Sequence, residues 1–124
     1  MTDEFIATEN GNISISEEVI IRISAISARE VEGVTALGTA SSWGDFLSKK
    51  SSAKGIKVEM NEDGTVIEVH ASVKFGLRIN DVAKKLQEAV KTAVETYTGI
   101  ENITVNVFID GIDPEKPEEN KAEE

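Results

Sequence analysis

Apolar residues recur at helical spacing in two stretches of the chain, and each stretch ends in glycine followed by an apolar residue. The first stretch ends at Gly33-Val34 and its apolar stripe is Val19, Ile20, Ile23, Ile26 and Val31. The second ends at Gly99-Ile100 and its stripe is Val82, Leu86, Ala89, Val90, Ala93, Val94 and Tyr97. Glycine in the left-handed conformation closes many helices. The pattern therefore predicts two amphipathic helices, the first capped by Ser16 or Ser14 and the second by Asn80, with Asp81 in its first turn.

Apolar and polar residues alternate between and after the helices. Apolar and polar residues alternate from Gly55 to Met60, as in a strand. The next four residues, Asn61-Glu62-Asp63-Gly64, predict a hairpin turn with positive φ at Asp63-Gly64. The return strand alternates as well, and one set of its residues points inward. That set is Ile67, Val69, Ala71, Val73 and Phe75. In the last strand Ile103, Val105, Val107 and Ile109 point inward, while Thr104, Asn106, Phe108 and Asp110 point outward. This alternation predicts a sheet with one buried and one wet face.

These elements predict an α+β fold with two helices packed on one face of a small, mainly antiparallel sheet. The order is β-α-β-β-α-β, the ferredoxin-like split βαβ arrangement, if Ile13 to Ser16 counts as a strand, and α-β-β-α-β if it does not. We expect a single domain over residues 12–112, a flexible N-terminus over 1–11 and a disordered acidic tail over 113–124.

Residues 35–54 form a long Gly-, Ser- and Ala-rich connection that contains the only tryptophan, Trp43, and Phe46. Connections of this length are uncommon in compact domains. We interpret it as a mobile loop with a few residues packed back on the core; the alternatives are a partner-binding or short helical segment, and a catalytic lid.

The charge and the cysteine content exclude several classes of function. The net charge is -10, with much of the acidity near the two ends, so a phosphate backbone is a poor partner. The chain has no cysteine, no apolar run that would span a membrane and no signal-peptide pattern, and we expect a cytoplasmic protein, peripheral to a membrane only through a partner.

The motifs of enzymes and cofactor sites are missing as well. His70 is the only histidine, on the outward side of a strand, and the sequence has no Walker lysine, GxGxxG or GxSxG. We expect no enzymatic activity, no cofactor and no metal. Chains of this order include KH domains, but Phe75-Gly76-Leu77-Arg78 lacks the second glycine of the RNA-clamping GXXG loop.

Two places in the sequence favour contacts with another protein. Phe108 is an outward aromatic on the wet sheet face, which also carries Val66 and His70. Trp43 and Phe46 in the long connection offer a second apolar surface. Aromatic side chains in a polar surround are typical of reversible interfaces.

Several blocks of the sequence resemble the alkaline shock, or general stress, family of small proteins from Gram-positive bacteria. These blocks are Gly11 to Ile20, Ala28 to Val34, Gly55 to Glu59, and Tyr97 to Ile100 followed by Val105 to Ile112. The resemblance implies a non-enzymatic protein of cell-envelope stress and homeostasis that self-associates and binds a membrane-anchored partner. A small-ligand regulatory domain and a KH-like RNA-binding domain remain the alternatives, because the fold alone does not decide between them.

Overall fold

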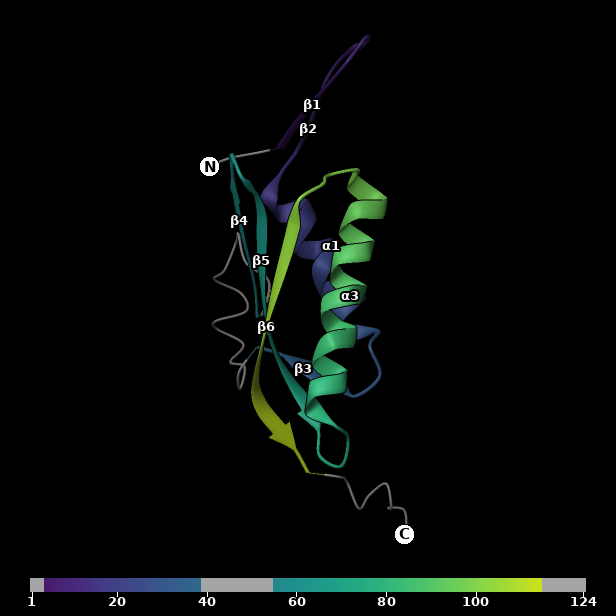
Figure 1. The fold of residues 1–124 in the computed structure, drawn as a ribbon, viewed down its shortest axis with the longest axis vertical. Helices are drawn as coiled ribbons and strands as arrows, with labels where there is room; N and C mark the ends of the chain where they lie inside the picture. The colour runs from purple at the N-terminus through teal and green to yellow at the C-terminus, as the bar shows by residue number, and fades with distance from the viewer. Residues whose placement is uncertain (1–3, 39–54, 115–124) are drawn as a thin grey trace.

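The computed structural model describes residues 4–38 and 55–114 of the chain, and it has two layers. Helices α1 (Glu17–Arg29) and α3 (Ile79–Thr98) lie side by side on one face of a four-stranded sheet (Figure 1). The strands of this sheet are β3 (Val34–Leu37), β4 (Ile56–Asn61), β5 (Gly64–Lys74) and β6 (Ile103–Asp113). The predicted fold class is confirmed.

Strand β5 is the centre of the sheet. Along one edge it pairs antiparallel with β4, from Asn61↔Gly64 to Ile56↔Val69, and then with the shorter β3. Along the other edge it pairs with β6 in parallel, from Thr65↔Ile103 to Lys74↔Asp113. The order from α1 onward follows the second of the two predicted orders, with β3 added before the long connection. The sequence analysis had placed that connection from Thr35, and it had placed Asp113 in the tail instead of at the end of β6.

A separate hairpin precedes the helices. Strand β1 (Glu4–Thr8) pairs antiparallel with β2 (Gly11–Ile15), and the two project beyond the end of the main sheet (Figure 1). The Thr8 hydroxyl stabilises the turn, because it donates to the carbonyl of Gly11 and accepts from the backbone N–H of Asn10. The sequence predicts a flexible segment over residues 1–11 and a short strand from Ile13 to Ser16, whereas residues 4–15 form the two strands of a hairpin.

The helix ends agree only in part with their prediction. Ser16 caps α1, and Gly99 ends α3 at φ 78° with its N–H bonded to the carbonyl of Glu95, as expected. Helix α1, however, ends at Arg29 with Glu30 as its cap, before Gly33. Helix α3 begins one residue before Asn80, and its N-cap is Arg78, which forms an ion pair with Asp81.

The core lies between the helices and the sheet. Its fully buried side chains include Ile20, Ile56, Ile67, Val69, Val73, Leu86, Val90 and Val94. Four residues predicted to point inward are exposed instead: Val19, Ile26, Phe75 and Tyr97. Phe75 lies just beyond the end of β5. In α1 the buried face is Ile20, Ile21, Ser24, Ala25 and Ala28, so the stripe with Val19 and Ile26 faces away from the sheet.

Candidate functional site

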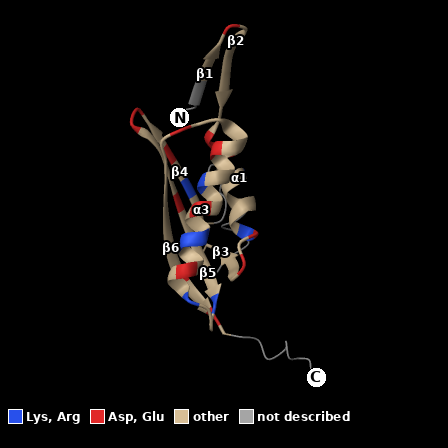
Figure 2. Ribbon diagram, turned by 45° about the vertical axis from the view of Figure 1, so that its right-hand side comes forward, with Lys and Arg blue, Asp and Glu red and all other residues tan. Residues whose placement is uncertain are grey.

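The sheet face opposite the helices carries the predicted partner-binding residues that the structure describes. Both helices lie on the other side of the sheet (Figure 2). We define the outer sheet face by the side chains that alternate with the buried ones on β5 and β6: Val66, Glu68, His70, Thr104, Asn106, Phe108 and Asp110. Trp43 and Phe46 lie outside the described residues.

The centre of the outer sheet face is a stacked pair of rings. The ring centroids of His70 and Phe108 are 4.7 Å apart and their planes differ by 9°. Phe108 is 42% exposed, and the side chain of His70 is 32% exposed. A half-exposed aromatic pair on a sheet retains apolar surface that another protein can bury.

Two carboxylates hold the imidazole of His70 in this position. Its Nδ1 lies 2.6 Å from Oδ2 of Asp110, and its Nε2 lies 3.4 Å from Oε1 of Glu68. Because an ionised carboxylate only accepts hydrogen bonds, the Nδ1–H donates to Asp110. The ring is therefore fixed between β5 and β6, with Phe108 against its face.

The parallel register of β5 and β6 brings these residues together. His70 pairs directly with Phe108, and Asp110 follows two residues later on the same face. The register shifts at Asp110, because Ala71 pairs with Ile109 and Ser72 pairs with Gly111. A β-carbon at Gly111 would lie 2.5 Å from the hydroxyl of Ser72. The sequence analysis named His70 and Phe108 but missed Asp110 as a partner, because outward alternation alone does not show which residues of two distant strands are opposite each other.

The arrangement of His70 favours a structural role over catalysis. A histidine base needs one ring nitrogen directed at the group that it deprotonates, while the other is held by an orienting partner. Here both nitrogens lie against carboxylates. Within residues 4–38 and 55–114, no three His, Asp or Glu side chains are arranged to hold a metal ion.

The main chain of His70 is also the point where the long connection leaves and re-enters the sheet. The N–H of Gly38 donates to the carbonyl of His70, and the N–H of His70 donates to the carbonyl of Gly55, both at 2.7 Å. Gly38 and Gly55 flank the segment that contains Trp43 and Phe46. The two regions that the sequence analysis selected for partner contacts are thus attached to one residue of β5.

The outer sheet face carries charges of both signs. Glu68 lies opposite Lys57 in the β4–β5 pairing, and Glu59 lies opposite Val66. Lys74 follows at the end of β5, next to Asp113 on β6. The described part of this surface therefore has two lysines, Lys57 and Lys74, close to carboxylates, and a second copy related by a two-fold axis can place these lysines against carboxylates of the first.

A comparison of the sequence with models of protein families identifies the family of this chain. Residues 6–114 match the model of the alkaline shock protein 23 family, which is described as having a cell envelope-related function. The chain belongs to this family. The resemblance found in the sequence is therefore confirmed, and the match includes the β1–β2 hairpin from Ile6 onward.

Two bacterial relatives cover most of the chain. The uncharacterized protein YqhY of Bacillus subtilis is 34% identical over 107 residues, which are 85% of this chain and 79% of that protein. The uncharacterized protein Spy1614 of Streptococcus pyogenes is 32% identical over 111 residues, 86% of this chain and 92% of its own. Among solved structures, a variant of the MamM CTD superposes with a TM-score of 0.48 at 14% identity over 77% of this chain and 95% of that one. In the described part of the chain, no helix is long and apolar enough to cross a membrane.

Proposed function

We propose that this protein is a non-enzymatic assembly protein of the cell envelope, which self-associates through the outer sheet face and binds a membrane-anchored partner from the cytoplasmic side. The observation that carries the proposal is the stacked, half-exposed His70–Phe108 pair at the centre of the sheet face opposite the two described helices. An aromatic centre with a polar rim is the arrangement of moderate, reversible interfaces. The cell envelope-related function of the family supports the cellular setting.

A second copy of this chain is the occupant that the outer sheet face favours. Lys57 and Lys74 lie among Glu59, Glu68 and Asp110, so two copies related by a two-fold axis can pair opposite charges while their Phe108 rings meet near the axis. A net charge of -10 opposes direct adsorption on anionic lipid, which favours attachment to the membrane through a protein. Trp43 and Phe46 are proposed as additional contacts on the basis of the sequence alone.

Sedimentation velocity over a wide concentration range tests the self-association. The wild-type protein should sediment faster as its concentration rises, and Phe108→Asp should raise the dissociation constant about thirtyfold or more, as expected for a central aromatic contact. Tyr97→Asp is the matched control, because Tyr97 is an exposed aromatic on the helix layer. A strictly monomeric wild-type protein, or equal effects of the two substitutions, would contradict the proposal.

A further inference from the structure

A groove runs between the two helices on the side away from the sheet. It has a volume of about 860 Å³, and side chains from both helices and from the residues after α1 line it. Its apolar part consists of Ile23, Ile26, Val31, Ala89, Ala93 and Tyr97. We call this surface the helix groove.

The sequence of α1 explains why the helix groove is apolar. Helix α1 has two apolar stripes, and the one with Ile20 and Ile21 faces the sheet. The other contains Val19, Ile23 and Ile26, at the i, i+4, i+7 spacing with which a helix contacts another helix. Ile26 is 59% exposed and Val19 is exposed as well, whereas Ile23 is partly buried against the core, so the core covers only part of this second stripe.

The sequence of α3 explains why the surface is hollow. The α3 residues that line it include Ala89, Thr92, Ala93 and Thr96, which are all small. Short side chains on one helix beside longer ones on its neighbour leave a channel along the pair. Tyr97 closes one end and is 76% exposed, more than any other large apolar or aromatic residue among those described.

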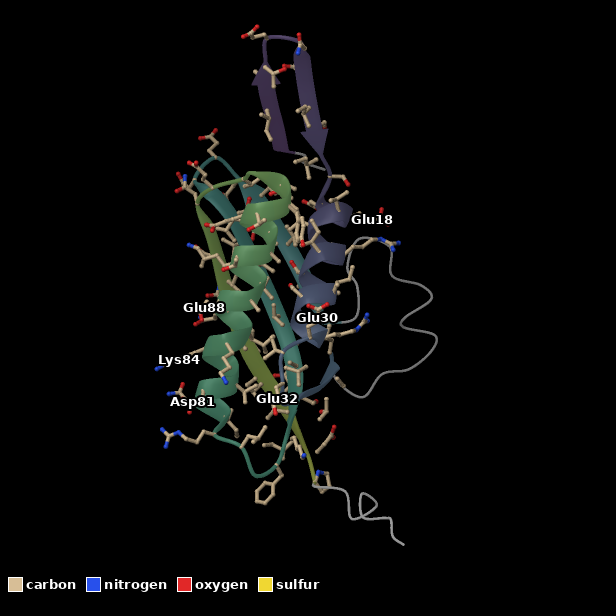
Figure 3. The ribbon with its side chains drawn as sticks, turned by 90° about the vertical axis from the view of Figure 1, so that its right-hand side faces the viewer. Glu18, Glu30, Glu32, Asp81, Lys84 and Glu88 are labelled. Atoms are coloured by element: carbon tan, nitrogen blue, oxygen red, sulfur yellow. The ribbon has the colours of Figure 1, made fainter. Side chains whose placement is uncertain are left out.

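The charges along the helix groove identify the chemistry of its occupant. Its lining includes three glutamates, Glu30, Glu32 and Glu88, and one lysine, Lys85, so carboxylates outnumber amines. Figure 3 shows Glu30 and Glu32 at the end of α1, whereas Glu88 lies toward the outer side of α3, near Lys84. A second copy of the same groove would bring these carboxylates together and would be repelled. A segment with lysine or arginine beside an apolar face would neutralise them.

We propose that the helix groove binds an amphipathic helix from another protein, with apolar side chains at i, i+4 and i+7 and with lysine or arginine along its flank. The apolar side chains lie over Ala89 and Ala93 between Ile26 and Tyr97, and the basic side chains reach Glu30, Glu32 and Glu88. Helix-in-groove recognition of this kind depends on a few apolar anchors, and charge complementarity supplies the specificity. This inference rests on the proposed function in one respect: the partner of the proposed function would bind in the helix groove, separate from the outer sheet face.

Three synthetic peptides of about 18 residues, or about five helical turns, provide the probes. The first has leucines at the stated spacing and lysines on its flank, the second replaces each lysine with glutamate, and the third contains the residues of the first in scrambled order. Fluorescence anisotropy at two salt concentrations gives the dissociation constants. The basic peptide should bind at least about tenfold more tightly than the other two, with the difference reduced at high salt.

Substitutions in the helix groove test its location. Ile26→Ser and the charge reversal Glu30→Lys should each weaken binding of the basic peptide by about tenfold or more. Glu62→Lys, on the exposed turn between β4 and β5, is the control for charge reversal and should change binding less than about twofold. Circular dichroism confirms that each variant is folded.

The same variants separate this inference from the proposed function. Ile26→Ser should still self-associate, and Phe108→Asp should still bind the basic peptide. Equal binding of the acidic and basic peptides, or binding that is unchanged by Ile26→Ser and Glu30→Lys, would overturn the inference. Loss of self-association in Ile26→Ser without peptide binding by the wild-type protein would show that a second copy occupies the groove, which also overturns it.

Discussion

Replacement of Gly55 by alanine tests how closely the chain packs where it re-enters the sheet beside His70. Gly55 has φ 79°, and a β-carbon there would lie 2.4 Å from the backbone nitrogen of Gly38 and 2.6 Å from the carbonyl oxygen of His70. Alanine in the left-handed region costs about 1–2 kcal/mol. To relieve the contact, Gly38 must also move away from His70, which breaks the hydrogen bond between them.

The loss of stability in Gly55→Ala is the sum of the backbone cost and the cost of the broken hydrogen bond. Loss of a hydrogen bond that leaves a buried group without a partner costs about 1–3 kcal/mol, and Gly38 is buried. We therefore expect Gly55→Ala to lower the free energy of unfolding by about 2–5 kcal/mol in total.

Gly99→Ala is a matched control, because Gly99 has φ 78° and nothing lies within 4 Å of a β-carbon built there. Gly99→Ala should lower the free energy of unfolding only by the cost of placing alanine in the left-handed backbone conformation, about 1–2 kcal/mol. Urea denaturation followed by far-UV circular dichroism gives both values, provided that the m-values agree. If the two variants are destabilised equally, the close packing of Gly38, Gly55 and His70 is not a feature of the protein in solution.

Three further predictions concern the core, the tail and nucleic acid. Leu86→Ala should lower the free energy of unfolding by about 2–5 kcal/mol because Leu86 is fully buried, whereas Val19→Ala, on the exposed stripe of α1, should change it by less than about 1 kcal/mol in the same urea titration. Deletion of residues 115–124, half of which are glutamates, should leave the free energy of unfolding within about 0.5 kcal/mol of that of the full chain, and a larger loss would show that the tail packs on the domain. Fluorescence anisotropy should detect no binding of single-stranded RNA at physiological salt, because the net charge is -10, and a salt-sensitive micromolar affinity would favour the KH-like alternative.

The strands that were predicted correctly are those whose two faces differ in polarity. Strands β4, β5 and β6 alternate over six or more residues, and this period places their buried and exposed faces without further information. Strand β3 was missed because Val34–Leu37 is short and leads into a Gly- and Ser-rich segment. Strand β1 was missed because the segment around it is mostly polar, and its stability comes from pairing with β2.

The errors in the helices have a different cause. The sequence shows that α1 is amphipathic but not which of its two apolar stripes faces the sheet, because Ile20, Ile23 and Ile26 are equally apolar. The packing of α1 against the sheet determines which stripe is buried: Ile20 and Ile21 are buried, and Ile26 is exposed. The same limit applied to the candidate site, since the contact between His70 and Asp110 depends on a parallel register between strands 40 residues apart.

The two proposed surfaces lie on opposite layers of the molecule, and their charges give them different partners. On the outer sheet face the lysines of one copy can lie against carboxylates of the other, whereas the helix groove has a single lysine, Lys85, among three glutamates. Pairing through the sheets would leave the helix layers of both copies pointing outward, so a dimer would present two grooves. Two grooves in one assembly bind a clustered partner more tightly than one groove does, because the second contact forms at a high effective concentration. Self-association would then strengthen partner binding without any contact between the two surfaces, and Phe108→Asp would weaken binding to clustered partners while leaving the affinity for a single helix unchanged.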